Sequence, residues 1–326
     1  MSERNCEQSR SEFKSINNIE HEVTKKVREF YERFHFPGVR PADKDGLILM
    51  RRMVKYVFKR SPQRTKMRVL DAGCGTGNTV ISLARRFGDV DFLGIDISEP
   101  SLSQAEQAAS DVGLLNLRFK RWDLMIPFHE EGIFDVVLCL GVLHHTADME
   151  HVLLNLRSML KNEGELYLWI YGSHGRYRHA LNRRLLEMLL DAKEESLDSL
   201  SLAKEFVFKV GHGVILADLF GNTPASSKYK EILEDPAWLA DQFLHPNEIL
   251  IDMEKLLLLV ARSGLEVDAW LGIPDDISKH INSPELVERF DLLPGNKRLV
   301  ALDLLLKPDH YFMTFRKNAG QKGGLP

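Results

Sequence analysis

Short apolar runs and longer helical stripes follow one another through the middle of the chain. The runs with strand character cover residues 68–72, 91–97, 117–122, 134–140 and 165–171. Segments between them carry apolar residues at i, i+3, i+4 and i+7, as at Val80, Leu83, Ala84 and Phe87, which is the spacing of an amphipathic helix. Strands that alternate with helices are typical of βαβ units, so this pattern predicts an α/β fold built on a parallel sheet.

Capping and turn residues indicate where two of the intervening helices begin and end. Ser98 offers a hydroxyl for an N-cap, Pro100 falls in the first turn, and Gly113 closes that helix. Asp148 opens another helix, whose apolar stripe extends to Leu160. These signals place one helix between the second and third strands and one between the fourth and fifth.

The segments on either side of this core have different patterns. Residues 173–245 are helical in pattern, rich in Leu and charge, and contain no convincing strand, so they predict a helical cap inserted into the fold. The βα rhythm resumes with a helix at 247–263, a strand at 265–270, a helical piece at 284–306 and a last strand at 311–316. We therefore divide the chain into a tail and helical arm (1–66), a core (67–172), the cap insertion (173–245), a segment that completes the core sheet and carries a second helical insertion (246–317), and a tail (318–326).

The composition restricts the class of protein. Apolar residues form 44% of the 326 residues, which suits one large core with additions and argues against a disordered or fibrous chain. The 43 Lys and Arg against 47 Asp and Glu give a formal net charge of −4, so a nucleic-acid partner is not expected. The basic stretch 51–68 is interpreted as a solvated helix face.

The cysteines and the absence of long apolar runs indicate the compartment. Cys6, Cys74 and Cys139 lie far apart without the spacing of metal ligands, so we expect a reducing environment and assign no metal ligands. No apolar run approaches the roughly 18 residues of a membrane span, and the first 20 residues lack an apolar signal segment. These features predict a cytoplasmic protein and leave its oligomeric state open.

The most informative motif is the glycine-rich stretch at 69–77, Val-Leu-Asp-Ala-Gly-Cys-Gly-Thr-Gly, at the exit of the first strand. Glycines there allow the backbone to turn sharply and a ligand to approach closely, and the next helix points free N–H groups at that ligand. The loop predicts a cofactor site containing Asp71, Gly73, Cys74, Gly75 and Gly77. Its G-x-G-x-G spacing differs from the G-x-G-x-x-G of dinucleotide binders, which disfavours a pyrophosphate ligand.

Acidic residues at the ends of the next two strands extend this site. Asp96 lies 96 − 77 = 19 residues beyond the loop, where a carboxylate can accept hydrogen bonds from both hydroxyls of a ribose. Asp123 follows the third strand and could accept from an adenine amino group while Leu124 packs on the ring. Ile97 and Leu140, at the ends of the second and fourth strands, belong to the same predicted site.

With these motifs, the sequence resembles the class I S-adenosylmethionine-dependent methyltransferases. The resemblance rests on 69–77, 93–96, Asp123 and 134–137, and later motifs at 143–148 and 160–166 match as well. Residues 162–164 depart from the family, reading Asn-Glu-Gly where Pro-Gly-Gly is common. The resemblance implies a Rossmann-like sheet of seven strands with the last strand antiparallel, S-adenosylmethionine as cofactor, and a subgroup that acts on small molecules.

Three histidines are candidates for acid–base chemistry. His144 and His145 follow the fourth strand at the rim of the cofactor loop, and His245 borders the insertion. Any of them could act as a base toward a hydroxyl or protonated amine, and packing or capping is the alternative for each. Tyr31 and Phe36 could close over the cofactor or hold the N-terminal helix. The expected partner is a small-molecule or lipid-like acceptor.

Two other classes of function stay open at this point. A nucleotide-dependent oxidoreductase of Rossmann type would share the fold but needs its third glycine one position later. A cofactor-binding partner of another methyltransferase subunit would retain the loop, Asp96 and Asp123 without any chemistry of its own.

Overall fold

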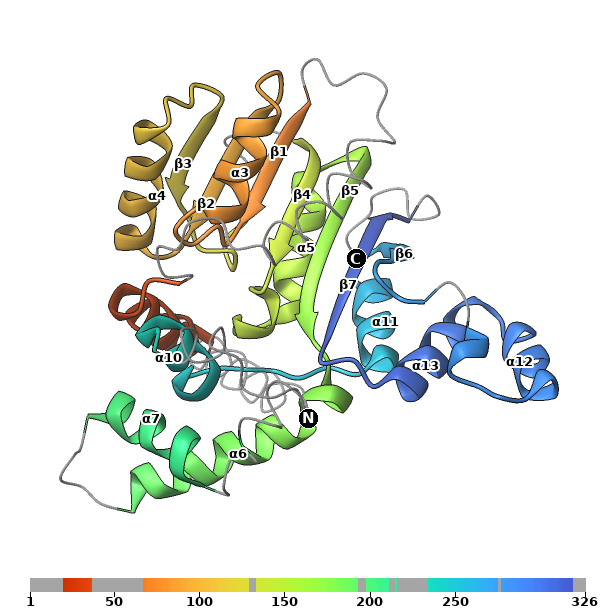
Figure 1. Cartoon of the computed structure of the whole chain (residues 1–326). Helices are drawn as coiled ribbons and strands as arrows, with labels where there is room; N and C mark the ends of the chain where they lie inside the picture. The colour runs from red at the N-terminus through yellow and green to blue at the C-terminus, as the bar shows by residue number, and fades with distance from the viewer. Residues whose placement is uncertain are drawn as a thin grey trace, which may run out of the picture.

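The computed structural model describes residues 20–36, 67–128, 133–192, 198–210, 215, 234–274 and 277–318. A seven-stranded sheet with the order β3-β2-β1-β4-β5-β7-β6 forms its centre (Figure 1). β7 runs antiparallel between β5 and β6, whereas the other neighbouring pairs are parallel. This arrangement confirms the Rossmann-like methyltransferase sheet expected from the sequence. The strands are β1 (Arg68–Ala72), β2 (Asp91–Asp96), β3 (Leu117–Arg121), β4 (Phe134–Leu140), β5 (Leu160–Tyr171), β6 (Leu265–Trp270) and β7 (His310–Lys317).

Helices cover both faces of this sheet. Neighbouring residues of each strand point to opposite sides, so both faces carry apolar side chains that the helices bury. On one face, Val69 packs with apolar residues of α3 (Asn78–Arg86) and α4 (Glu99–Asp111). On the other face, Leu70 packs with residues of α5 (Met149–Met159) and α11 (Met253–Arg262). The predicted caps of α4 and α5 are confirmed, since the Ser98 and Asp148 side chains accept hydrogen bonds from their first turns.

The cap insertion forms a second packed unit at the end of the sheet toward which the parallel strands point (Figure 1). It contains α6 (Ser173–Asp191), α7 (Ser199–Lys209) and α10 (Pro236–Leu244). These helices share a small apolar core that includes Leu186, Phe206 and Phe243. A helix over residues 20–33 lies beside α10 at the same end. The basic stretch interpreted as a helix face lies outside the described residues up to residue 66, as do both ends of the chain.

Two helical predictions in the C-terminal part differ from the structure, one in where it begins and one in its continuity. The predicted helix 247–263 begins only at Met253, because Asp252 is the N-cap that accepts from Lys255 N and the preceding residues are extended. The predicted piece 284–306 is two helices, α12 (Pro284–Asp291) and α13 (Gly295–Leu306), because Pro294 interrupts it. Two short 3-10 turns, η1 (Leu143–His145) and η3 (Ile277–Lys279), complete the described elements. No described helix is both long enough and apolar enough to cross a bilayer.

Candidate active site

A cavity of about 370 Å3 lies where the carboxyl ends of the parallel strands meet the cap and the N-terminal helix. Side chains from β1, β2, β4 and β5 line it from the sheet side, and residues of helix 20–33 and α10 line it from the other. Four of the described lining residues are carboxylic acids and none is Lys or Arg. Because opposite charges attract more strongly in a partly desolvated site, this lining favours a cationic ligand. The four acids are Asp71, Asp96, Asp123 and Asp241.

The glycine loop takes a backbone path that side chains oppose. Gly73, Gly75 and Gly77 have φ values of 80°, 54° and 81°, a region in which glycine is strongly favoured. A Cβ on Gly73 would also come within 2.4 Å of the Val142 side chain. The loop is tied to β2, since Gly75 N donates to an Asp96 carboxylate oxygen at 2.8 Å. The same carboxylate accepts from Ser98 N at 2.9 Å, so Asp96 holds the loop in place as well as facing the cavity.

Burial raises the pKa of the two acids beside the glycine loop, Asp71 and Asp96. It raises the pKa of the Asp71 carboxyl from 3.8 to about 7, with a further contribution from the charge of Asp96. Burial also raises the pKa of Asp96, opposed by the backbone hydrogen bonds from Ser98 and Gly75. Negative charge on Asp71 and Asp96 is therefore energetically costly until a positively charged or hydrogen-bond-donating ligand binds beside them.

The residues assigned to the cofactor from the sequence converge on this cavity, with one exception. Those that line it are Asp71, Gly73, Cys74, Gly75, Asp96, Ile97, Asp123, Leu124 and Leu140. Gly77 does not line it and instead starts α3 as its N-cap. Cys74 and Cys139 are buried free thiols.

Of the three candidate histidines, only His145 lines the cavity. Its Nδ1 lies 2.9 Å from Asn247 O; since a carbonyl can only accept, Nδ1 carries the proton and Nε2 keeps its lone pair. Burial lowers the pKa of His145 to about 3, so the ring is neutral. Neither nitrogen of His144 has a hydrogen-bond partner among the described residues, and its ring packs 4.0 Å from that of Tyr171.

His245 has the opposite tautomer. Asn247 N donates to its Nδ1 at 3.1 Å, which leaves the proton of the neutral ring on Nε2. The rings of His145 and His245 stack, with their centroids 3.7 Å apart. Asn247 thus fixes the tautomers of both histidines through its backbone, while its side chain donates to the carbonyls of His145 and Thr146.

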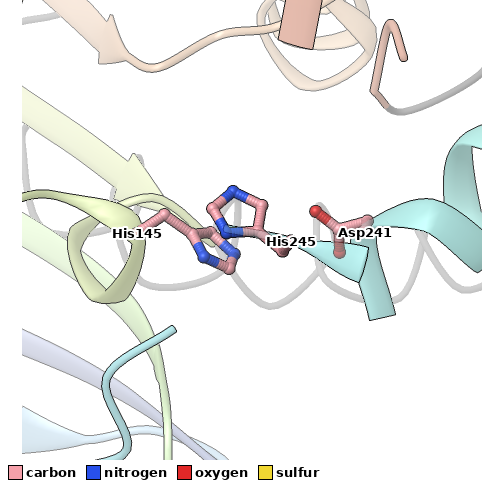
Figure 2. Close-up of side chains that lie close together, drawn as sticks. All are labelled: His145, Asp241 and His245. Carbon is pink, nitrogen blue, oxygen red and sulfur yellow. The ribbon is translucent and has the colours of Figure 1, made fainter. Parts of the chain in front are cut away.

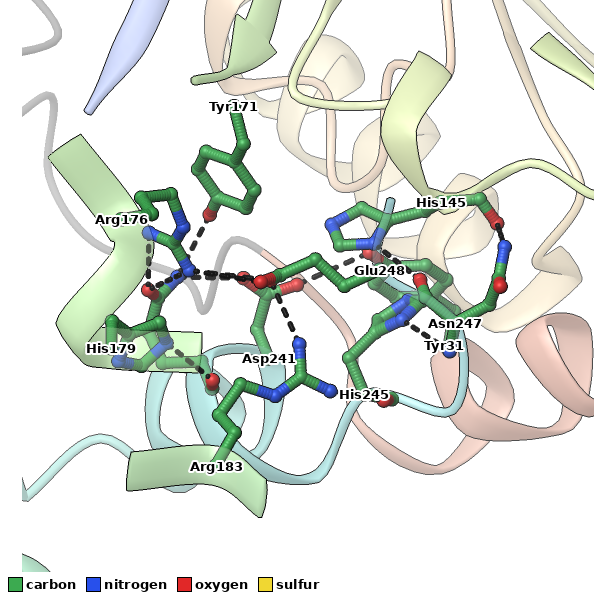
Figure 3. A network of polar contacts seen from close by, with 11 residues as sticks. Tyr31, His145, Tyr171, Arg176, His179, Arg183, Asp241, His245, Asn247 and Glu248 are labelled. Atoms are coloured by element: carbon green, nitrogen blue, oxygen red, sulfur yellow. Dashed lines mark hydrogen bonds and ion pairs between the residues drawn. The ribbon is translucent and has the colours of Figure 1, made fainter. Parts of the chain in front are cut away.

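A buried polar network supports the cap side of the cavity (Figure 3). Arg176 and Arg183 both pair with Glu248, at 3.2 and 2.9 Å. Arg176 also donates to Gln242 Oε1, so the Gln242 amide nitrogen is left to donate to the Tyr171 hydroxyl and to Asp241 Oδ2.

This network fixes the orientation of the Asp241 carboxylate, which lines the cavity. Tyr31 OH donates to Asp241 Oδ1 at 3.1 Å, across 210 residues of sequence. Burial raises the pKa of Asp241 to about 6. Sequence reasoning missed Asp241, Gln242 and Asn247, because they come from a cap helix and an extended segment whose local patterns carry no recognisable motif.

His145, Asp241 and His245 each offer an atom that could bind a metal ion, and these atoms lie within 4.8 Å of one another (Figure 2). The hydrogen bonds oppose that use. A metal on Nε2 of His245 would need the ring proton on Nδ1, where Asn247 N–H already donates. The cluster therefore fits a hydrogen-bonding site better than a three-ligand metal centre.

Comparison with known proteins agrees with this geometry. Residues 70–166 match the family model described as a methyltransferase domain. This part of the chain is thus similar to a methyltransferase domain. The matched residues begin within β1 and end within β5, and they contain the glycines of the loop, Asp96, Asp123 and His145.

Similar proteins match parts of the chain. An uncharacterized protein from Synechococcus sp. is 28% identical over 263 residues, covering 76% of this chain and 59% of that protein. The tRNA 5-carboxymethoxyuridine methyltransferase of Escherichia coli is 35% identical over 134 residues, covering 40% of this chain and 50% of that enzyme. The chain thus spans between half and three fifths of the length of these two relatives.

A solved structure, PKMT2 from Rickettsia typhi in complex with AdoHcy, shares the fold with a TM-score of 0.60. It is 15% identical and covers 79% of this chain and 50% of that chain.

Proposed function

We propose that this protein is a methyltransferase that transfers the methyl group of S-adenosylmethionine to a small-molecule or lipid-like acceptor. The observation that carries this proposal is that one and the same cavity is lined both by the predicted cofactor residues and by cap residues such as Asp241 and Trp238. A cofactor and an acceptor bound in one enclosed space can react directly, with water excluded. The expected cytoplasmic location is part of the same proposal.

The residues present fit the cofactor of the family. S-adenosylmethionine is a cation that supplies an electrophilic methyl group. Asp96 would hold its ribose hydroxyls, Asp123 and Leu124 its adenine, and Asp71 its ammonium group, while the glycine loop leaves room for close approach. The raised pKa of Asp71 suits this role, because a buried carboxylate gains most from a cationic partner.

The same lining argues against the oxidoreductase alternative. A dinucleotide carries a pyrophosphate, which would meet four carboxylic acids and no Lys or Arg among the described lining residues. Of the three candidate histidines, we assign His145 to contact with the acceptor. Its low pKa makes it a weak proton acceptor, so its Nε2 lone pair serves mainly to orient the acceptor by a hydrogen bond.

Two measurements test the proposal. Calorimetry should show binding of S-adenosylmethionine and none of NADH. Incubation with S-adenosylmethionine labelled in its methyl group and a protein-free bacterial metabolite extract should yield a labelled product by mass spectrometry. Cofactor binding without any labelled product would instead favour the non-catalytic partner subunit.

A further inference from the structure

The cap end of the cavity presents two hydrogen-bond acceptors, Asp241 and His145, whereas the third member of their cluster, His245 with its Nε2–H, does not line the cavity. Asp241 contributes a carboxylate whose two oxygens each receive one hydrogen bond, from Tyr31 and Gln242. A carboxylate has about four lone-pair sites, so it can accept more. His145 contributes the Nε2 lone pair that Asn247 fixes. Both residues line the cavity.

The side chains of Asp241 and His145 are close enough to hold one group. An oxygen of Asp241 and a nitrogen of His145 lie within 4.8 Å of each other, and hydrogen bonds of about 2.8–2.9 Å from one central atom span that distance. A hydroxyl has one hydrogen and can satisfy only one of them. A primary amine has two, so it can donate to both and keep its own lone pair free.

Charge and shape at this end point to the same chemical class. Methylation of a neutral amine creates positive charge on its nitrogen, and a fixed carboxylate stabilises charge that develops in the transition state. The aromatic rings of Tyr31, Tyr171 and Trp238 also line the cavity, and aromatic faces attract organic cations. A carboxylate acceptor would instead be repelled by Asp241, which is mostly ionised above pH 7.

We propose that the acceptor is a small-molecule amine, and that Asp241 and His145 hold its two N–H groups. This inference rests on the proposed methyltransferase function. The nitrogen lone pair forms the new N–C bond, the S–C bond breaks with its electron pair passing to sulfur, and the products are a methylammonium and S-adenosylhomocysteine. The amine reacts in its neutral form, having released its proton to solvent before it binds, so no base is needed during transfer. This agrees with the weak basicity of His145.

The test identifies the bond that the transferred methyl group makes. The protein is incubated with S-adenosylmethionine carrying a 13C methyl group and the small-molecule fraction of a bacterial metabolite extract. Correlated 13C–1H spectra distinguish N-methyl from ether, ester and thioether methyl groups. We expect an N-methyl product.

Asp241→Asn and a matched control connect the product to the site. Asn removes the charge with little change in shape, and we expect turnover of the identified amine to fall by about 100-fold or more while calorimetric affinity for S-adenosylmethionine stays within about threefold. The amine should also bind more weakly to the variant loaded with S-adenosylhomocysteine. Asp235→Asn lies on the same helix at its N-cap, where Asn caps as well as Asp, so it should behave as the parent.

Each other outcome decides the question. An ether, ester or thioether product overturns the amine while leaving the methyltransferase function intact. An N-methyl product whose rate is unchanged in Asp241→Asn overturns the role of Asp241. No product from a protein that binds S-adenosylmethionine overturns the proposed function itself. Stoichiometric metal in the purified protein, measured by mass spectrometry and lost in His245→Ala, would assign the cluster to an ion instead.

Discussion

Asp96 combines two tasks that the sequence could not separate. Its carboxylate faces the cavity and at the same time accepts from the backbone of Gly75 and Ser98. The loop and the ribose site therefore depend on one side chain. At the same scale, Asp71 is a buried acid without such hydrogen bonds from the loop, so its charge is opposed mainly by burial.

Replacement of Asp96 should weaken cofactor binding. Asp96→Ala removes an anionic acceptor from a buried site, and hydrogen bonds to charged groups contribute about 1.5–3 kcal/mol. We expect the Kd for S-adenosylmethionine to rise by about 10- to 100-fold in calorimetry. Glu99→Ala changes an exposed acid nearby and should leave the Kd unaltered. An unchanged Kd in Asp96→Ala would remove the central cofactor assignment.

Replacement of Asp71 should change how stability depends on pH. A folded-state pKa of about 7 against 3.8 means that the folded protein holds a proton that the unfolded chain has lost. Stability from this group is therefore present below pH 4 and falls as pH rises through 7. Asp71→Asn does not undergo this loss. The free energy of unfolding of the cofactor-free variant should therefore exceed that of the parent by up to about 4 kcal/mol at pH 8 and by little at pH 4.

Thermal unfolding across that pH range measures the effect of Asp71→Asn. Asp89→Asn changes an exposed residue and provides the control. The unfolding temperature of this variant should follow that of the parent at every pH. A difference between Asp71→Asn and the parent that does not vary with pH would contradict the assigned cause.

At the scale of elements, the loop between β1 and α3 decides whether a ligand can approach. Its positive φ angles and its bond from Gly75 N to Asp96 hold it in one conformation. The loop is fixed at one end by Gly73 N and Cys74 N, which both donate to Ile95 O at 2.8 and 3.0 Å. A change confined to this loop should thus affect binding more than folding.

Gly75→Val tests this element. Gly75 has a φ of 54°, which a β-branched residue adopts only with strain, and the added side chain would enter the cofactor space. We expect S-adenosylmethionine binding to become undetectable by calorimetry while circular dichroism still shows the α/β fold. Gly88→Val is the matched control, because a Cβ there meets no atom within 4 Å. Normal binding by folded Gly75→Val would show that the loop does not touch the ligand.

At the scale of the whole molecule, the cap and the core are two packed units joined at the cavity. The cap has its own apolar core, and buried ion pairs from Arg176 and Arg183 to Glu248 connect α6 with the segment that follows α10. The chain leaves β5 at Gly172 and returns to pair with it at Ile251. The insertion can therefore be exchanged near the point where its two ends approach.

Removal of the cap should separate the two activities of the cavity. Replacing residues 173–245 with a flexible linker removes Asp241 and Trp238 but keeps the glycine loop, Asp96 and Asp123. We expect S-adenosylmethionine to bind and methyl transfer to be lost. Trp238→Ala provides a milder version in the full chain, where turnover should fall and cofactor affinity should hold.

The outcome that would reject this division is specific. Tyr177, Leu181 and Met188 on α6 are 62%, 50% and 64% exposed, and such a face could serve self-association instead. Loss of oligomers by size-exclusion chromatography with full turnover in the cap-replaced protein would assign the insertion to assembly.

The sequence by itself determined the sheet and the cofactor half of the site. Periodicity located both ends of β1 and β4 to the residue. The spacing of the glycine loop, Asp96 and Asp123 predicted one cofactor site, because parallel strands bring their carboxyl ends to one edge of the sheet. The limits of α11 failed where an Asp252 cap overrode an apolar pattern that began earlier.

Only the tertiary structure decided the acceptor half. Tyr31 and Asp241 meet across 210 residues, and the tautomers of His145 and His245 depend on the backbone of Asn247. No local pattern encodes such contacts, because they depend on how the cap and the N-terminal helix pack on the sheet. The physical reason is that cofactor residues are positioned by neighbouring strands, whereas acceptor residues are positioned by packing between distant segments.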